Sequence, residues 1–151
     1  MAVRPRKKPA RKAPESIESW RQGADQLEAL AQGTAKALSE GDLGAAQTHF
    51  REYRKLLLSH LAHEEDVSFP MAVKRAPSQG GPIKSLRVAH IGIRRDLEQV
   101  ASHLDLGHAE AARAVFGAFL ESFAAHERLE DQLVELLRKS PAGTGSARRS
   151  R

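Results

Sequence analysis

Apolar residues recur along this chain at alternating intervals of three and four positions, in four separate series that a few polar residues share. The series are Ile17, Trp20, Ala24, Leu27, Ala31, Thr34 and Leu38; Ala46, Phe50, Tyr53, Leu57, His60, Glu64 and Val67; Leu86, His90, Ile93, Leu97, Val100 and Leu104; and Ala112, Phe116, Phe119, Phe123, His126, Glu130, Leu133 and Leu137. Residues at this spacing lie along one face of an α-helix. Strand-like alternation is absent, so the pattern predicts four amphipathic helices.

Capping and breaking residues set the expected ends of these helices. Ser16 is a suitable N-cap for the first helix, and Gly41 with Asp42 makes a tight connection in which Asp42 caps the second. Pro70 is expected to stop the second helix, because proline lacks the N–H that a helix interior requires. The expected helices therefore cover residues 16–40, residues 42–69, a third stretch from Pro82 to the helix-breaking Gly107 after a loop over 76–81, and residues 109–139.

The alternating intervals also indicate how the helices pack. Intervals of three and four are typical of helices that pack nearly antiparallel in a bundle. Short connections between consecutive helices favour an up-down-up-down order. A chain of 151 residues is long enough to bury one core. We therefore predict an all-α fold, an antiparallel four-helix bundle that forms a single domain over residues 15–139.

The net charge of +5 arises at the two ends of the chain. Residues 1–13 carry six Lys/Arg and residues 140–151 carry three, with no acid in either, while the remainder holds 15 Lys/Arg against all 19 Asp/Glu. The Pro, Ala, Gly and Ser content predicts disordered basic tails over 1–14 and 140–151. Basic arms of this kind can contact nucleic acid or another anionic partner, which is one interpretation of them. A solubilising role is the preferred interpretation, since no aromatic residues or binding fold accompany them.

The chain contains no cysteine, which excludes disulfides, thiolate metal sites, iron–sulfur clusters and cysteine nucleophiles. Any metal site must therefore be built from His, Asp and Glu. No apolar run reaches the length of a membrane span, and no apolar stretch or cleavage site follows the basic start of the chain. We expect a cytoplasmic protein that does not contact a membrane.

Ionisable residues interrupt three of the four apolar series. His60 is followed four positions later by Glu64, and His126 is followed four positions later by Glu130. Residues four apart share one helix face, so each pair is expected to point into the core. His90 stands alone in the third series. Burial of a carboxylate is costly unless it is paired or bound to a metal, so these residues require an explanation.

These five residues are expected at one level of the bundle. In up-down order, the start of the third helix lies beside the ends of the second and fourth, and at about 1.5 Å per residue all five fall roughly 8–20 Å from that end. A single core histidine is usually a hydrogen-bonded packing residue, and one His–Glu pair can satisfy itself. Five such groups from three helices favour a metal site, and imidazole with carboxylate suits iron, manganese or zinc.

The same residues resemble the motifs of a known family. The stretch HLAHEEDVSFP at residues 60–70 resembles the second-helix motif of hemerythrin-like (HHE cation-binding) domains, in which Glu follows His by four and an aromatic–Pro pair ends the helix. The third-helix pattern, a His with an apolar residue three later, is matched by His90 and Ile93. The fourth-helix pattern, a His with an acid in the next turn, is matched by His126 and Glu130. The resemblance covers nearly all of the predicted folded body.

The resemblance implies a non-haem centre of two irons, with a single metal, manganese or zinc as the alternatives. Glu64 and Glu130 would bridge the two metals, His60 would serve one iron, and His90 and His126 would serve the other. Members of the family bind or sense oxygen, sense iron or redox state, or buffer metal. The implied ligands are therefore metal ions together with dioxygen or small anions, and the implied role is binding or sensing and not enzymatic catalysis.

One ligand of the family pattern is missing from this chain. The family's first-helix histidine falls on Ala24, which the apolar series places in the core at the matching depth. The expected centre therefore has an open position, a substitute ligand or only one occupied metal, and Glu28, one turn after Ala24, is the preferred substitute. A second histidine one turn after His90 occurs in oxygen-carrying members and falls here on Arg94, which argues against a simple oxygen carrier.

The remaining ionisable residues are weaker candidates. His63 lies one turn from the expected site and is interpreted as a partly exposed residue, with support or replacement of a ligand as the alternative. The other histidines, expected at the opposite end of the bundle, are His49, His103 and His108. The acids interpreted as solvated or as supports behind the ligands are Glu65, Asp66 and Glu127.

Two other metalloprotein classes do not fit the spacing. A ferritin-like oxidase uses Glu with His three residues later, whereas here His precedes Glu by four and no Glu-x-x-His occurs. A zincin requires a second His four residues after His63, where Val67 stands. The alternative function is a degenerate, metal-free helical bundle that serves as an interaction module, with its basic tails contacting anionic partners.

Overall fold

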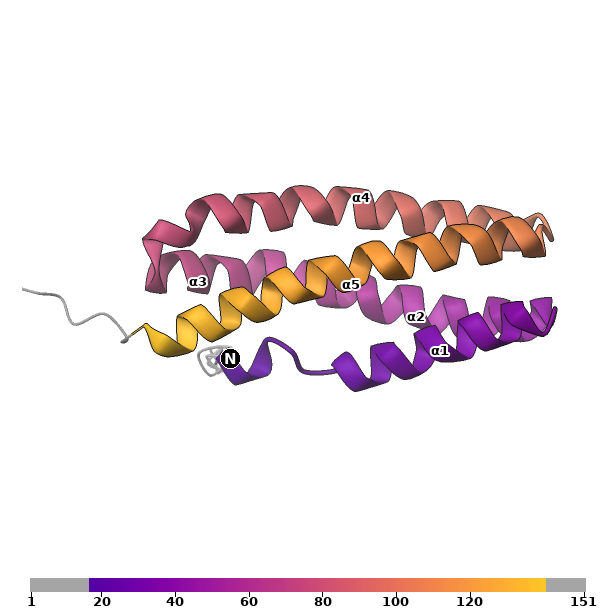
Figure 1. Cartoon of the computed structure of the whole chain (residues 1–151), viewed down its shortest axis with the longest axis horizontal. Coiled ribbons are helices and arrows are strands. Elements are labelled where there is room, and N and C mark those ends of the chain that lie inside the picture. Colours follow the sequence, from indigo (N-terminus) through magenta and orange to yellow (C-terminus); the bar gives the residue numbers. More distant parts are fainter. Residues whose placement is uncertain (1–16, 141–151) are drawn as a thin grey trace, which may run out of the picture.

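A computed structural model describes residues 17–140 of the chain as helices joined by short connections (Figure 1). Strands are absent from these residues, which confirms the predicted all-helical fold. The Ser16 cap and most of both basic tails lie outside the described residues. The elements are η1 (Ile17–Ser19), α1 (Ala24–Ser39), α2 (Leu43–His63), η2 (Glu64–Ser68), α3 (Phe69–Arg75), η3 (Pro77–Gln79), α4 (Gly80–Asp105) and α5 (Ala109–Lys139).

The long helices lie side by side as a bundle (Figure 1). The α1–α2 and α4–α5 turns lie at one end, and the connection from α3 to α4 lies at the other. Asp42 caps α2 as predicted, because its Oδ1 accepts a hydrogen bond of 3.0 Å from the Ala45 N–H. Gly41 and Gly107 have φ of 71° and 73°, a left-handed conformation that glycine adopts without steric cost. These turns bring the ends of consecutive helices together.

The first helix begins later than the sequence indicated. Only the single 3-10 turn η1 is helical before Gly23, whose φ of 87° breaks the chain direction, and α1 starts at Ala24 instead of residue 16. Trp20 lies in the connection and is 1% exposed, with its ring 5.8 Å from that of Phe69. The apolar spacing is the same in a helix and in this turn, so the periodicity alone could not locate the break.

The prediction that Pro70 stops the second helix is wrong. The chain passes from α2 through the π-helical turn η2 into α3 and remains helical to Arg75. In η2 the Phe69 N–H donates to the carbonyl of Glu64, five residues earlier, and Pro70 then falls in the first turn of α3. The extra residue in this turn rotates the inward face, so Ser68 is buried and Val67 is only half-buried.

The apolar core is divided into two clusters by a layer of polar side chains. The larger cluster lies toward the α1–α2 turn and contains Phe50, Tyr53, Leu97 and Phe116 among others. The second contains Trp20, Phe69, Ile83, Leu86, Leu133 and Leu137 among others. On α4, for example, Leu86 belongs to one cluster and Ile93 to the other, with buried His90 between them. No helix within residues 17–140 combines the length and apolar character needed to cross a bilayer.

Candidate metal centre

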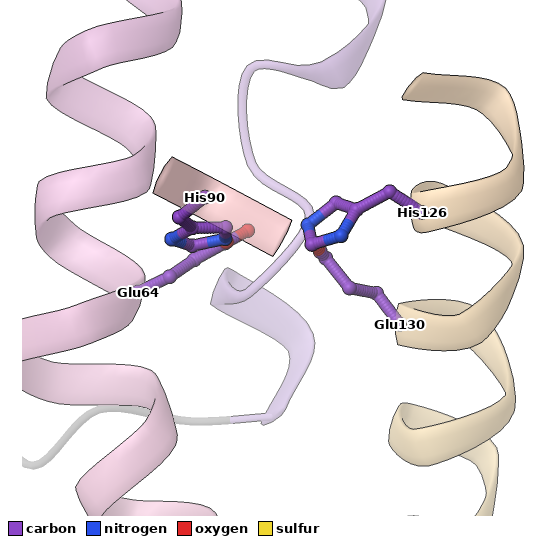
Figure 2. A group of neighbouring side chains, drawn as sticks. All are labelled: Glu64, His90, His126 and Glu130. Carbon is purple, nitrogen blue, oxygen red and sulfur yellow. The ribbon is translucent and has the colours of Figure 1, made fainter. Parts of the chain in front are cut away.

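Four buried side chains from three helical segments meet in the polar layer (Figure 2). Glu64 comes from the π-helical turn η2, His90 from α4, and His126 and Glu130 from α5. Each offers one nitrogen or oxygen atom, and these four atoms lie within 4.8 Å of one another. The side chains point toward a common space from opposite sides of the bundle (Figure 2). The structure therefore brings together four of the five residues that the sequence placed at one depth.

The polar atoms in this group approach one another without satisfying one another. His90 Nε2 lies 3.1 Å from Glu64 Oε2, and His126 Nε2 lies close to Glu130 Oε1. Both oxygens of Glu64, Nε2 of His90 and both nitrogens of His126 nevertheless have no hydrogen-bond partner among the described residues. Buried polar atoms are rarely left without partners, because their desolvation is then uncompensated. A cation held by these lone pairs would supply the missing interaction, so the residues fit a metal.

His60 joins the group at its edge. Its Nε2 lies 2.7 Å from Glu64 Oε1, and its side chain is 17% exposed, whereas those of Glu64 and His90 are at most 1% exposed. His60 is not one of the four residues whose donor atoms lie within 4.8 Å of one another. It therefore contacts the carboxylate of Glu64 from the side, one helical turn before it on α2.

His90 is connected on its outer side to a charged pair. Its Nδ1 lies 2.8 Å from Glu65 Oε1 in hydrogen-bond geometry. Arg94 donates from Nη1 to Glu65 Oε1 at 2.7 Å and from Nη2 to Oε2 at 3.0 Å. Arg94 thus contacts Glu65 and does not join the buried group. Glu65 therefore lies directly behind His90, which agrees with one of the two interpretations that the sequence offered for this acid.

The structure does not bring Ala24 or Glu28 into the buried group. Glu28 is exposed and accepts a hydrogen bond of 3.3 Å from Gln32, so it is not the expected substitute ligand. Ala24 is half-buried, because the late start of α1 places it in the first helical turn. Arg21 approaches instead, with Nη1 3.9 Å from Glu130 Oε2. Arg21 follows Trp20 and lies outside the apolar series, so the spacing of apolar residues did not indicate it.

Arg21 also pairs with the exposed edge of α5. It donates to Glu127 Oε1 at 3.4 Å, and its Nη1 lies 3.4 Å from Asp131 Oδ1. The one signal in the sequence was a cluster of acids on α5, in which Glu130 and Asp131 follow Glu127 by three and four positions. Such a cluster is stabilised by a cation from a neighbouring element, but the spacing does not indicate which element supplies it.

The other histidines lie outside the buried group. His63 is exposed and does not contribute a donor atom to it. His103 and His108 are 6.1 Å apart between ring centres, near the α4–α5 turn. His49 is on α2 and packs beside Gly33 of α1. These positions agree with the sequence interpretation of the three as remote from the site.

The two buried carboxyl groups differ in their titration. Burial raises the pKa of Glu64, but the adjacent His60 and His90 rings outweigh burial and lower that pKa to about 2. Burial raises the pKa of Glu130, and the charge of Glu64 adds to this effect against the opposing His126. Burial lowers the pKa of His60, but Glu64 outweighs it and the net pKa is raised. Glu64 is therefore the strongly anionic member of the pair, and its charge is available to a cation.

The metal-free protein is expected to lose stability as the pH falls from about 4.5 toward 2 because Glu64 becomes protonated. A carboxyl group whose pKa is lowered by folding stabilises the fold at pH values above its unfolded pKa, and this contribution is lost as protons bind the folded group. Urea unfolding of chelator-treated protein across this range should show a steeper pH dependence than the same series on Glu64→Gln. Glu130, whose pKa is shifted in the opposite direction, is present in both proteins. An equal pH dependence of the free energy of unfolding in the two proteins would therefore show that Glu64 is not its cause.

A cleft of about 470 Å³ lies between α1 and α5 beside the buried group. Arg21, Ala24 and Glu127 line it, together with Tyr53 and Phe123 of the larger apolar cluster. The Phe123 ring stacks on that of His126 with 6.1 Å between centres. The cleft therefore reaches the side chains that flank His126 and Glu130.

Comparison with known proteins adds one finding. The family model described as the hemerythrin HHE cation-binding domain matches residues 18–145, which is most of the chain. Searches of curated proteins and of solved structures gave no significant match.

Proposed function

The chain belongs to the hemerythrin HHE cation-binding domain family, and from this premise we propose that it is a non-haem protein with a centre of two irons, which binds dioxygen or small anions or senses oxygen, redox state or iron. The observation that carries this proposal is the group of four buried side chains whose donor atoms converge within 4.8 Å. Five atoms of that group lack hydrogen-bond partners among the described residues. A donor set of imidazole and carboxylate without sulfur suits iron, with manganese or zinc as alternatives.

In the proposed centre, Glu64 and Glu130 would hold the metals from opposite sides of the bundle together with His90 and His126. His60 would complete the donor set beside Glu64. The four-atom group has the size of a single cation site, and His60 lies beyond it against Glu64. Metals in two-metal sites lie about 3.5–4 Å apart. The offset of His60 supports a second position, and a single occupied metal is the alternative.

In this proposal, dioxygen or a small anion would reach the centre from the cleft beside α1. Ala24 lines that cleft where the family pattern has a histidine, so this side offers no imidazole. When bound, iron would supply reversible electron transfer and binding of small molecules. The chain supplies Arg21 as a cation beside Glu130, and Tyr53 and Phe123 as the bulky walls of the cleft. We assign no catalytic residue and propose binding or sensing within a bundle of up-down-up-down order, which the positions of the turns in Figure 1 support.

The direct test is metal analysis of the full chain expressed in iron-replete medium. We expect close to two irons per chain and near-ultraviolet absorption of a ferric centre, because the buried donor atoms otherwise remain unsatisfied. One equivalent would establish the single-metal alternative. Absence of iron, manganese and zinc above background, in a protein that is folded by circular dichroism, would favour the metal-free interaction module.

A further inference from the structure

The outer face of His90 carries a hydrogen-bonded chain that no ligand assignment uses. Oε1 of Glu65 lies 2.8 Å from His90 Nδ1. The two terminal guanidinium nitrogens of Arg94 donate hydrogen bonds of 2.7 and 3.0 Å to the two oxygens of Glu65. Paired N–H···O contacts of this kind fix the orientation of a carboxylate as well as its charge. The three residues come from η2 and α4, so the chain also ties these two elements together.

We propose that Glu65 and Arg94 are positioning residues that hold His90 in the tautomer required for metal binding, and that their charges set the reduction potential of the iron bound to it. This proposal rests on the proposed iron centre. The direction of the hydrogen bond supports this role. A carboxylate is only an acceptor, so the hydrogen between the two groups is on His90 Nδ1. In the neutral ring, Nε2 then carries the lone pair, and it is Nε2 that faces Glu64 at 3.1 Å.

Burial makes this constraint effective. His90 is 0% exposed and is packed between the rings of Phe69, 5.3 Å away, and His126, 5.0 Å away. The ring cannot turn over without disturbing these neighbours, and within residues 17–140 the hydrogen-bond partner of its Nδ1 is Glu65. A carboxylate behind a histidine also makes the histidine a more basic ligand, which favours the more highly charged state of the metal.

Arg94 acts on Glu65 through its charge as well as through its two hydrogen bonds. Its guanidinium lowers the pKa of Glu65, an effect that His90 reinforces against partial burial. Its side chain is 37% exposed, so it reaches Glu65 from the surface. Arg94 therefore acts on the centre through Glu65 and His90, from outside the buried layer.

The test compares four variants of the iron-loaded full chain. Glu65→Gln retains an acceptor oxygen but loses the negative charge. Arg94→Gln removes the guanidinium and with it the paired hydrogen bonds to Glu65. The matched controls are Asp66→Asn, an exposed acid next to Glu65, and Arg95→Gln, whose side chain is 74% exposed and pairs with Asp96. The measurements are the rate of iron loss to a chelator, the reduction potential of the centre, the melting temperature and the tautomer of His90 by nitrogen-15 NMR of the zinc-loaded protein.

We expect Glu65→Gln to lose iron about 10–100-fold faster, since partners behind metal-binding histidines have effects of this size. The reduction potential should become more positive, because a negative charge behind the ligand is lost. Arg94→Gln should also lose iron faster, to a smaller degree, because Glu65 is then held less firmly. Its reduction potential should become more negative, because a positive charge is lost, and both controls should match the parent protein.

Three results would overturn the proposal. The first is an iron-loaded Glu65→Gln that retains iron and potential at parental values, and the second is a His90 with its proton on Nε2 in the zinc-loaded parent. A change in melting temperature alone would also overturn it, because it would show a structural ion pair. Failure of the parent to bind any metal would instead contradict the proposed function, so the two failures are distinguishable.

Discussion

Glu130→Ala and His126→Ala are each expected to lower iron affinity by about 100-fold or more. Each change removes a proposed ligand, and removal of groups that only support a ligand already costs about 10–100-fold. Both residues are buried, with 2% and 5% exposure, so water replaces the lost ligand poorly. Iron content after dialysis against a weak chelator, together with a titration of the apoprotein, measures the effect.

His103→Ala is the matched control for these variants. His103 lies on α4 beside His108, outside the buried group, and its loss removes an imidazole of the same size. It should retain the iron content of the parent. If all three variants held equal amounts of iron, the proposed centre would be in the wrong place even though the fold and family would stand.

Metal removal is expected to lower the melting temperature of the parent protein by on the order of 10 °C. A ligand that binds only the folded state at about 1,000 times its Kd contributes roughly 4 kcal/mol, and each kcal/mol corresponds to a few degrees for a chain of this size. The buried atoms of Glu64, His90 and His126 that have no hydrogen-bond partner add to this dependence, because the cation satisfies them. Differential scanning calorimetry before and after chelation gives the measurement.

The Glu130→Ala variant provides the internal comparison. With its metal affinity reduced, its melting temperature should change little on chelation, whereas the parent should change strongly. A parent protein whose melting temperature is insensitive to chelator and to added iron would indicate that the polar layer is stable without a cation.

The helical segments could be predicted from the sequence because their physical cause is local. Apolar residues at intervals of three and four specify an amphipathic helix wherever they occur. All 28 positions in the four series are half-buried or buried, and of these Trp20 alone lies outside a helical element. The exception to the helical interpretation lies at residues 20–23, where a left-handed glycine interrupts a spacing that a turn also satisfies. Pro70 does not end the helical stretch, because it follows a π-helical turn and falls in the first turn of α3, where its missing N–H is tolerated.

The convergence of Glu64, His90, His126 and Glu130 followed from the sequence through spacing alone. Each residue occupies an inward position of its series, and helix rise fixes its depth once the helices pack side by side. The assignment of these residues as iron ligands remains a prediction, as do the domain boundaries and the role of the basic tails.

What surrounds the buried group was decided only by the tertiary structure. Arg21 beside Glu130, and Arg94 on Glu65 behind His90, are contacts between long side chains from different elements, and no periodicity records which partner a flexible charged side chain meets. Helix faces depend on local spacing, so the sequence determines them. The hydrogen bonds that orient a buried histidine depend on the distance and rotation between packed helices, so only the assembled bundle determines them.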